Sequence, residues 1–93
     1  MVVGILTLRL SIGEARSLKE KRRVLKSFKD RTRNSFNVSV AEIEGHDTWT
    51  SSALAIAMIG TDRRYVNGAL DAVVNAARRF PGAQLMDYEM EFL

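Results

Sequence analysis

The pattern of apolar and polar residues divides the chain into six elements. Apolar residues alternate with others in residues 2–12, 36–44, 50–60 and 86–92, which predicts four strands with one apolar face each. In residues 17–33 and 62–80 they recur at helical spacing instead, which predicts two amphipathic helices. The predicted order is therefore strand, helix, strand, strand, helix, strand.

Two helices and four strands of this kind pack most simply as an α+β fold. We expect a ferredoxin-like βαββαβ arrangement, a four-stranded antiparallel sheet with both helices on one face. Because strand–helix–strand crossovers are right-handed, residues 2–12 and 50–60 should form the central strands, with the last strand beside the first. At 93 residues, 46% of them apolar, residues 1–93 are expected to form a single domain.

Local signals refine these elements. Ser17 and Glu20 have the spacing of a capping box at the start of the first helix. In the second strand the apolar phase changes after Val40, which predicts a bulge near Ala41 or an edge position. The last strand is expected to turn Met86, Tyr88, Met90 and Phe92 inward and Asp87, Glu89 and Glu91 outward.

The first helix carries most of the positive charge. Residues 16–33 hold nine of the fourteen lysines and arginines but only two acids, so they carry +7 while the rest of the chain carries −4. A helical wheel turns Leu18, Val24, Leu25, Phe28 and Thr32 inward. Lys21 falls among these apolar positions, and we expect its long side chain to reach the rim and keep the ammonium group in water.

The outer face of this helix is the main functional signal. The cations expected there, with Arg16 just before them, are Lys19, Arg22, Arg23, Lys26, Lys29 and Arg33. Their unmatched charge predicts a polyanion partner, with RNA the first candidate, contacted through phosphates. Arginines of the second helix could extend the patch: Arg63, Arg64, Arg78 and Arg79. The alternative is that these cations only solvate an ordinary helix.

Signals for catalysis are weak. The chain has no cysteine, one histidine and no glycine-rich phosphate loop. Glu42, Glu44 and His46 would align only if their strand stayed extended through Gly45, and we interpret His46 as a solvated turn residue. We therefore expect a non-enzymatic protein with no catalytic residue, metal or cofactor. Lacking cysteines, a signal peptide and a long apolar run, it is also expected to be cytoplasmic, with no membrane segment.

The sheet face away from the helices suggests a different function. An RNA-recognition motif has the same element order and stacks bases on aromatic residues of this face, but here the side chains are small. The expected surface consists of Ile5, Thr7, Ala53, Ala55 and Ala57. Such a surface lets another sheet approach closely, so the alternative function is a homodimeric protein-interaction or small-ligand-sensing module. Trp49 is expected in the core or at an interface, with base stacking as its alternative.

The stretch SLKEKRRVLKSFKDRTRNSFNVSVAE, from Ser17 to Glu42, resembles the signature of the bacterial YlxP-like family, a domain of unknown function. The resemblance extends to VGIL at residues 3–6, HDTW at 46–49 and TDRRYV at 61–66. It implies a ferredoxin-like fold and carries over no catalytic residue. Members are often encoded among transcription and translation factors, including ribosome-binding factor A and initiation factor two, which implies a role near RNA or the ribosome.

Overall fold

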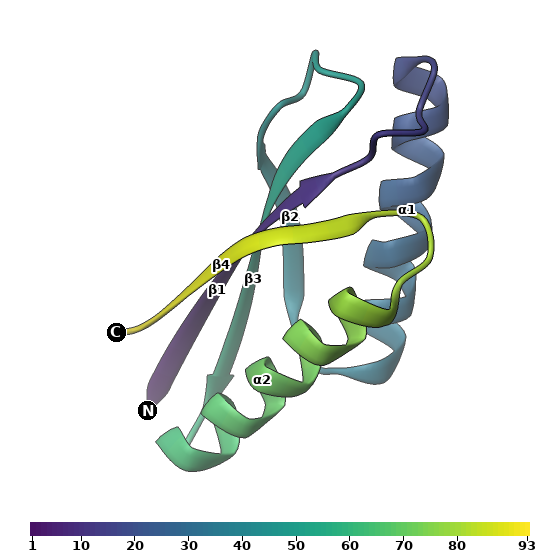
Figure 1. Ribbon diagram of the computed structural model, residues 1–93. Coiled ribbons are helices and arrows are strands. Elements are labelled where there is room, and N and C mark those ends of the chain that lie inside the picture. The colour runs from purple at the N-terminus through teal and green to yellow at the C-terminus, as the bar shows by residue number, and fades with distance from the viewer.

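The computed structural model describes residues 1–93 and shows the predicted element order (Figure 1). The helices are α1 (Leu18–Ser35) and α2 (Arg63–Arg79), and the strands are β1 (Val2–Ser11), β2 (Ser39–Glu44), β3 (Ser51–Gly60) and β4 (Gln84–Phe92). The sheet has the order β2-β3-β1-β4 with every neighbouring pair antiparallel. The ferredoxin-like fold is confirmed, including its central pair β1 and β3 and the position of β4 beside β1.

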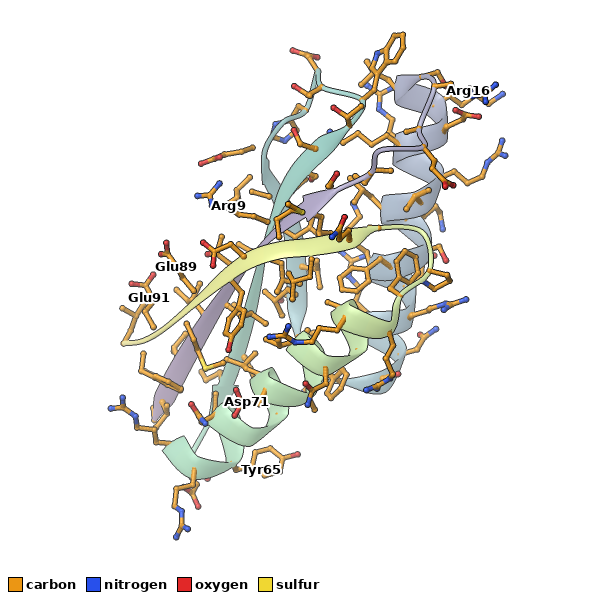
Figure 2. The ribbon with its side chains drawn as sticks, viewed as in Figure 1. Arg9, Arg16, Tyr65, Asp71, Glu89 and Glu91 are labelled. Atoms are coloured by element: carbon orange, nitrogen blue, oxygen red, sulfur yellow. The ribbon has the colours of Figure 1, made fainter.

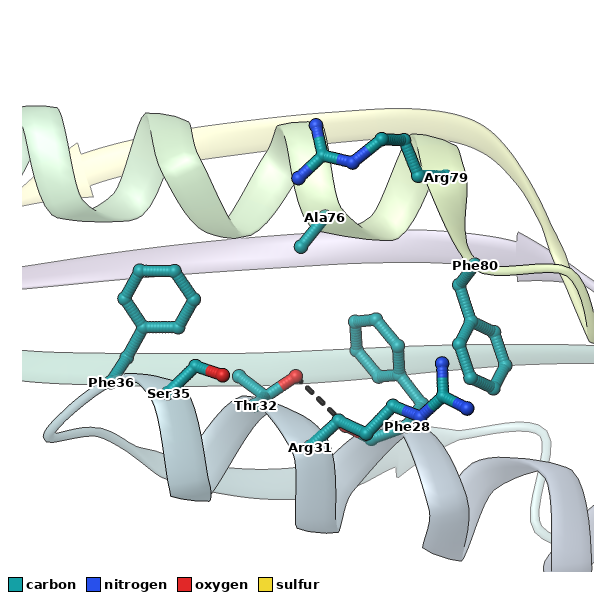
Figure 3. Close-up of a pocket in the computed structure, with 8 residues that line it drawn as sticks. All are labelled: Phe28, Arg31, Thr32, Ser35, Phe36, Ala76, Arg79 and Phe80. Carbon is teal, nitrogen blue, oxygen red and sulfur yellow. Dashed lines mark hydrogen bonds between the residues drawn. The ribbon is translucent and has the colours of Figure 1, made fainter.

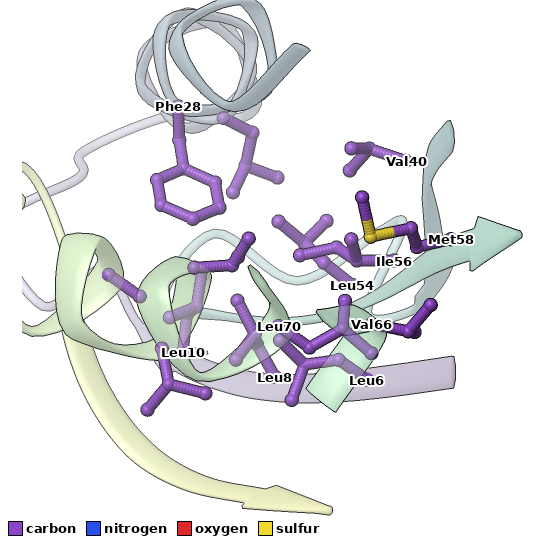
Figure 4. Close-up of a cluster of buried hydrophobic side chains, with 14 of the residues drawn as sticks. Leu6, Leu8, Leu10, Phe28, Val40, Leu54, Ile56, Met58, Val66 and Leu70 are labelled. Carbon is purple, nitrogen blue, oxygen red and sulfur yellow. The ribbon is translucent and has the colours of Figure 1, made fainter. Parts of the chain in front are cut away.

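The hydrophobic core lies between the sheet and the two helices (Figure 4). Leu6 of β1 lies opposite Ile56 of β3, and Leu8 lies opposite Leu54, so the large aliphatic side chains share the helix side of the sheet. A Cβ atom on Gly4 of β1 would come within 2.7 Å of side-chain carbons of Leu70 and Val66. Helix α2 therefore packs closely against the central strands.

Both helices begin at side-chain caps. The hydroxyl of Ser17 accepts a hydrogen bond from the backbone N–H of Glu20 (3.1 Å), as the capping-box spacing predicts. The carboxylate of Glu20 accepts from the backbone N–H of Arg16, one residue before the cap. In α2, the carboxylate of Asp62 accepts from the backbone N–H of Arg64 at 2.9 Å. Neither helix combines the length and apolar character that a membrane-spanning helix requires.

Both edge strands are irregular at the same end of the sheet. In β2 the register with β3 shifts between Glu42 and Glu44, so the edge position is confirmed and the bulge lies at Ile43 rather than near Ala41. In β4 the register with β1 shifts at Met86.

The shift in β4 corrects the prediction for its side chains. Leu85, not Met86, lies opposite the inward-facing Leu10, and Met86 is 61% exposed, so its predicted inward position is wrong. Tyr88 lies opposite Leu8 on the helix side but stays 39% exposed, because β4 is an edge strand. A bulge removes one residue from the alternation, and the sequence pattern alone does not show which one.

Candidate nucleic-acid interface

One side of helix α1 is fixed against the rest of the molecule, and this determines which side faces solvent. Its buried residues are Lys21, Leu25, Phe28 and Thr32, which lie on one helical face. The hydroxyl of Thr32 donates to the carbonyl of Phe28 (2.8 Å), so this polar group is satisfied inside the helix. The opposite side of α1 therefore carries the predicted cations into solvent.

Lys21 is buried, contrary to the prediction that its ammonium reaches the rim. The residue is 1% exposed. Its Nζ lies 3.0 Å from Oε2 of Glu42 and donates a hydrogen bond to the carbonyl of Gly45. The same carboxylate oxygen of Glu42 accepts a hydrogen bond from the hydroxyl of the buried Ser52 at 2.6 Å. We call these four residues the Lys21 cluster. It joins α1 to β2, β3 and the loop between them, where a helical wheel predicts only apolar contact.

Two features of β2 and its loop make this cluster possible. Glu42 lies opposite Leu54, on the helix side of the sheet, where it can reach Lys21. Burial would raise the pKa of the Glu42 carboxyl, but the hydrogen bonds from Ser52 and Lys21 outweigh burial and hold this pKa below its usual value. Gly45 has φ of +85°, a conformation that favours glycine and presents its carbonyl to Lys21.

Five of the seven predicted cations form neither an ion pair nor a side-chain hydrogen bond within the protein. These free cations are Arg16, Lys19, Arg22, Arg23 and Lys29. Lys26 is paired with Asp30 at 2.7 Å, and its hydrogen bond is the main reason that the pKa of Asp30 lies below its usual value. Arg33 donates to the carbonyl of Val40 at 2.9 Å. Four of the five free cations therefore lie in the N-terminal half of α1 or just before it.

Helix electrostatics do not account for this distribution. Cations are stabilised near a helix C-terminus and disfavoured near an N-terminus, because the macrodipole is positive at the N-terminus. Here Arg16 lies directly before the N-cap Ser17, and Lys19 is the second residue of α1. Figure 2 shows Arg16 at the start of α1 and the carboxylates of Glu89 and Glu91 on the opposite side of the molecule. The acidic and basic surfaces are thus spatially separate.

The arginines of α2 contact different parts of the molecule. The guanidinium of Arg63 lies 4.4 Å from the ring centroid of Phe92, and that of Arg78 lies 5.8 Å from that of Tyr88. Both stack on β4. Arg79 of α2 and Arg31 of α1 line a pocket between the helices. Sequence reasoning missed Arg31, because on the helical wheel it falls between the apolar and the cationic faces.

The helix-free face of the sheet is partly covered by one ion pair. Arg9 of β1 and Glu44 of β2 both lie opposite Ala53 of β3, and their side chains meet above it at 2.9 Å. Ala53 is consequently 2% exposed and is not available as interface, which corrects its predicted role. The other four predicted face residues are placed differently: Ile5, Thr7, Ala55 and Ala57 are half-buried and no helix covers them.

The remaining predicted residues lie at the end of β2 and in the loop that follows it. Because of the bulge at Ile43, Glu42 and Glu44 lie on opposite sides of the sheet and do not align with each other. His46 is exposed. Trp49 is 50% exposed, so a core role for it is wrong, whereas interface and stacking roles stay predictions.

Comparison with known proteins gives the same fold. The designed protein Foldit4 covers 100% of this chain and 97% of its own length, with a TM-score of 0.56 and 11% identity. The designed protein LFR1 1, which has a ferredoxin fold, covers 98% of this chain and 86% of its own, with a TM-score of 0.57 and 12% identity. At such identities the likeness concerns the fold alone.

Sequence comparison identifies the family. The "Uncharacterized protein YlxP" of Bacillus subtilis (strain 168) is 38% identical over 80 residues, which cover 86% of this chain and 87% of that protein. The family described as "Protein of unknown function (DUF503)" matches residues 3–90. The resemblance inferred from Ser17 to Glu42 is therefore confirmed, and the chain belongs to this YlxP-like family.

Proposed function

We propose that this protein is a non-enzymatic RNA-binding protein that contacts phosphates through the outer face of α1. The observation that carries the proposal is the set of free cations, which lie at the start of α1 and on the side away from its buried residues. Arg16 lies across the molecule from Glu89 and Glu91 of the acidic strand β4 (Figure 2). The Lys21 cluster holds the opposite side of α1 against the sheet, so these cations are presented from a fixed element. A fixed row of cations attracts a polyanion more strongly than the same charges dispersed over the surface.

The number of free cations sets the expected salt dependence. If all five contact phosphates of a single strand, log K against log salt should fall with a slope of about −3.5. Binding through phosphates alone is weak, with Kd on the order of 10⁻⁴–10⁻⁶ M at physiological salt. A flat salt dependence would rule out the proposal.

A pair of charge-reversing substitutions in α1 tests whether RNA binds at this helix. Arg22→Glu with Arg23→Glu should weaken binding to a short oligouridine strongly and make the salt slope shallower by about 1.4. The matched control is Arg63→Glu with Arg64→Glu, which changes the net charge equally at the far end of the molecule, in the first turn of α2. We expect the control to lose much less affinity. Equal losses in both variants would mean that net charge, not α1, determines binding.

The family resemblance suggests the ribosome as the setting of this RNA contact. Co-sedimentation with purified ribosomes at increasing salt would test this partner directly. Wild-type protein should pellet with ribosomes and be released as salt rises, while the Arg22→Glu, Arg23→Glu variant should stay in the supernatant. Pelleting that is equal for both proteins would argue against a ribosomal contact through α1.

The uncovered sheet face supports a second candidate, a homodimer formed by two copies of this chain. Ala55 and Ala57 lie on that face beside Ile5, and no helix covers them. Two such faces of small side chains could pack closely. Sedimentation should then show a concentration-dependent dimer that Ala55→Arg abolishes and that RNA does not affect. A wild-type protein that stays monomeric at all concentrations would eliminate this candidate.

A further inference from the structure

A pocket of about 230 Å³ opens between the C-terminal parts of α1 and α2 (Figure 3). Its inner wall is aromatic: Phe28 and Phe80 pack edge to face with ring centroids 5.3 Å apart, and Phe36 lies at the other end. Ala76 of α2 points into the space between the helices. The two helix backbones stay apart here, and a residue as small as alanine leaves the space between them unfilled.

Two arginines line the mouth of this pocket. Arg31 of α1 and Arg79 of α2 are both exposed, and neither forms an ion pair. The guanidinium of Arg31 lies 5.3 Å from the ring centroid of Phe80. Arg79 lies in the last turn of α2, where the helix macrodipole stabilises a cation, whereas Arg31 lies before the last turn of α1 and packs on Phe80. An aromatic wall flanked by two guanidinium groups that form no ion pair suits a flat ring with a negatively charged group on either side of it.

The volume of the pocket limits the class of ligand that it can hold. Pockets that hold a whole small-molecule ligand measure roughly 300–1,000 Å³, so this one is too small for a complete nucleotide cofactor. It has room for a single planar ring whose phosphates remain outside. One of the free cations also lies near this pocket: Arg23 precedes Arg31 by eight residues, so the two lie about 12 Å apart along the helix axis.

We propose that this pocket takes one unpaired nucleobase of an RNA strand bound along α1, while Arg31 and Arg79 contact the phosphates on either side of that base. The inference rests on the proposed RNA-binding function and adds a site for a base to a surface that otherwise contacts only phosphates. In single-stranded nucleic acids, bases stack on aromatic side chains with little preference for sequence. The protein would then distinguish single strands with accessible bases from duplexes, in which the bases are stacked and paired.

The test compares two ligands with the same phosphates. A short oligouridine and an abasic ribose-phosphate oligomer of equal length are titrated against the protein at one salt concentration. Wild-type protein should bind the oligouridine about tenfold more tightly, the contribution of one stacked base. Equal binding of both would overturn this inference and leave the proposed function intact. Binding of neither would overturn both.

A variant of the pocket tests where the preference for oligouridine over the abasic oligomer arises. Ala76→Leu should fill the pocket and reduce the tenfold preference to less than about twofold, while binding of the abasic oligomer and its salt slope stay unchanged. The matched control is Ala72→Leu, the same change one turn earlier in α2, at a half-buried residue outside the pocket. It should keep the preference. If Ala76→Leu keeps the preference and Trp49→Ala loses it, the base stacks on the loop after β2, and the proposed pocket is wrong.

A measurement on the wild-type protein removes any dependence on the folding of Ala76→Leu. Titration with uridine 5′-monophosphate, followed by ¹H–¹³C NMR, should shift the ring signals of Phe36 and Phe80 and leave those of Phe92 in place. Phe92 is the control, since it stacks with Arg63 and lies outside the pocket. Shifts absent from Phe36 and Phe80 at saturating oligouridine as well would overturn the inference.

Discussion

The two helices lie on the same side of one sheet, but different chemistry holds them there. Helix α2 buries only apolar side chains: Val66, Leu70, Val73, Val74 and Ala77. Helix α1 buries two apolar residues and two polar ones, Lys21 and Thr32. Apolar packing is not directional, whereas Lys21 must meet one particular carboxylate and one particular carbonyl. We infer that α2 mainly supplies stability, while α1 is held in a defined orientation with its cations outward.

The largest expected loss of stability comes from a substitution in α2. Leu70 is fully buried against β1, so Leu70→Ala should lower the free energy of unfolding by about 3 kcal/mol, from lost burial and the cavity that remains. Urea denaturation measures this loss. Gly68→Ala is a control in the same helix, since a Cβ there meets no atom within 4 Å and alanine favours helix. A loss under about 1 kcal/mol for Leu70→Ala would contradict the assignment of the core to α2.

The second-largest expected loss of stability concerns Lys21, the buried polar residue that holds α1 against the sheet. Lys21→Met keeps the apolar stem but leaves the Glu42 carboxylate buried without its cation. We expect a loss of about 2 kcal/mol, below the 3–5 kcal/mol of a fully buried pair, because Glu42 is 16% exposed and keeps the hydrogen bond from Ser52. Adding Glu42→Gln should recover about half of the loss. Additive losses in a double-mutant cycle would show that the two side chains are not coupled.

The pH dependence of stability tests the same pair. The pKa of Glu42 is lower in the folded protein than its ordinary value of 4.5, so the folded state favours the carboxylate. The stability that this carboxylate contributes is fully present above about pH 5 and is lost as the pH falls through the lowered pKa. Glu42→Gln should therefore lose less stability than wild type between neutral pH and about pH 3. Parallel curves for the two proteins would contradict the cluster.

The sequence predicted the elements and topology well because their causes are local and periodic. Alternation in β1 and β3, helical spacing in α2 and the hand of the crossovers leave few other arrangements. The cap at Ser17 also follows from a short-range pattern. These features need no knowledge of which residues meet across the fold.

The errors occur where a contact between distant segments overrides the local pattern. Lys21 is buried because Glu42, Gly45 and Ser52 supply partners for its ammonium, and a helical wheel does not contain them. Met86 turns outward because of a register shift that depends on pairing with β1. The outer cations were predictable from α1 alone, but the pairing of Lys26 with Asp30 required the actual rotamers.

The smallest expected effect compares the two halves of α1. Asp30 is the one acid that pairs with the outer cations, so Asp30→Asn should free Lys26, which lies between the free cations Arg23 and Lys29. With one more phosphate contact, the salt slope for oligouridine should change from about −3.5 to about −4.2, with a modest gain in affinity at low salt. Asp71→Asn in α2 makes the same charge change away from α1 and should leave the slope unchanged. An unchanged slope in Asp30→Asn would show that Lys26 does not contact the strand, because a freed Lys26 that lies within reach of the strand must release a counterion.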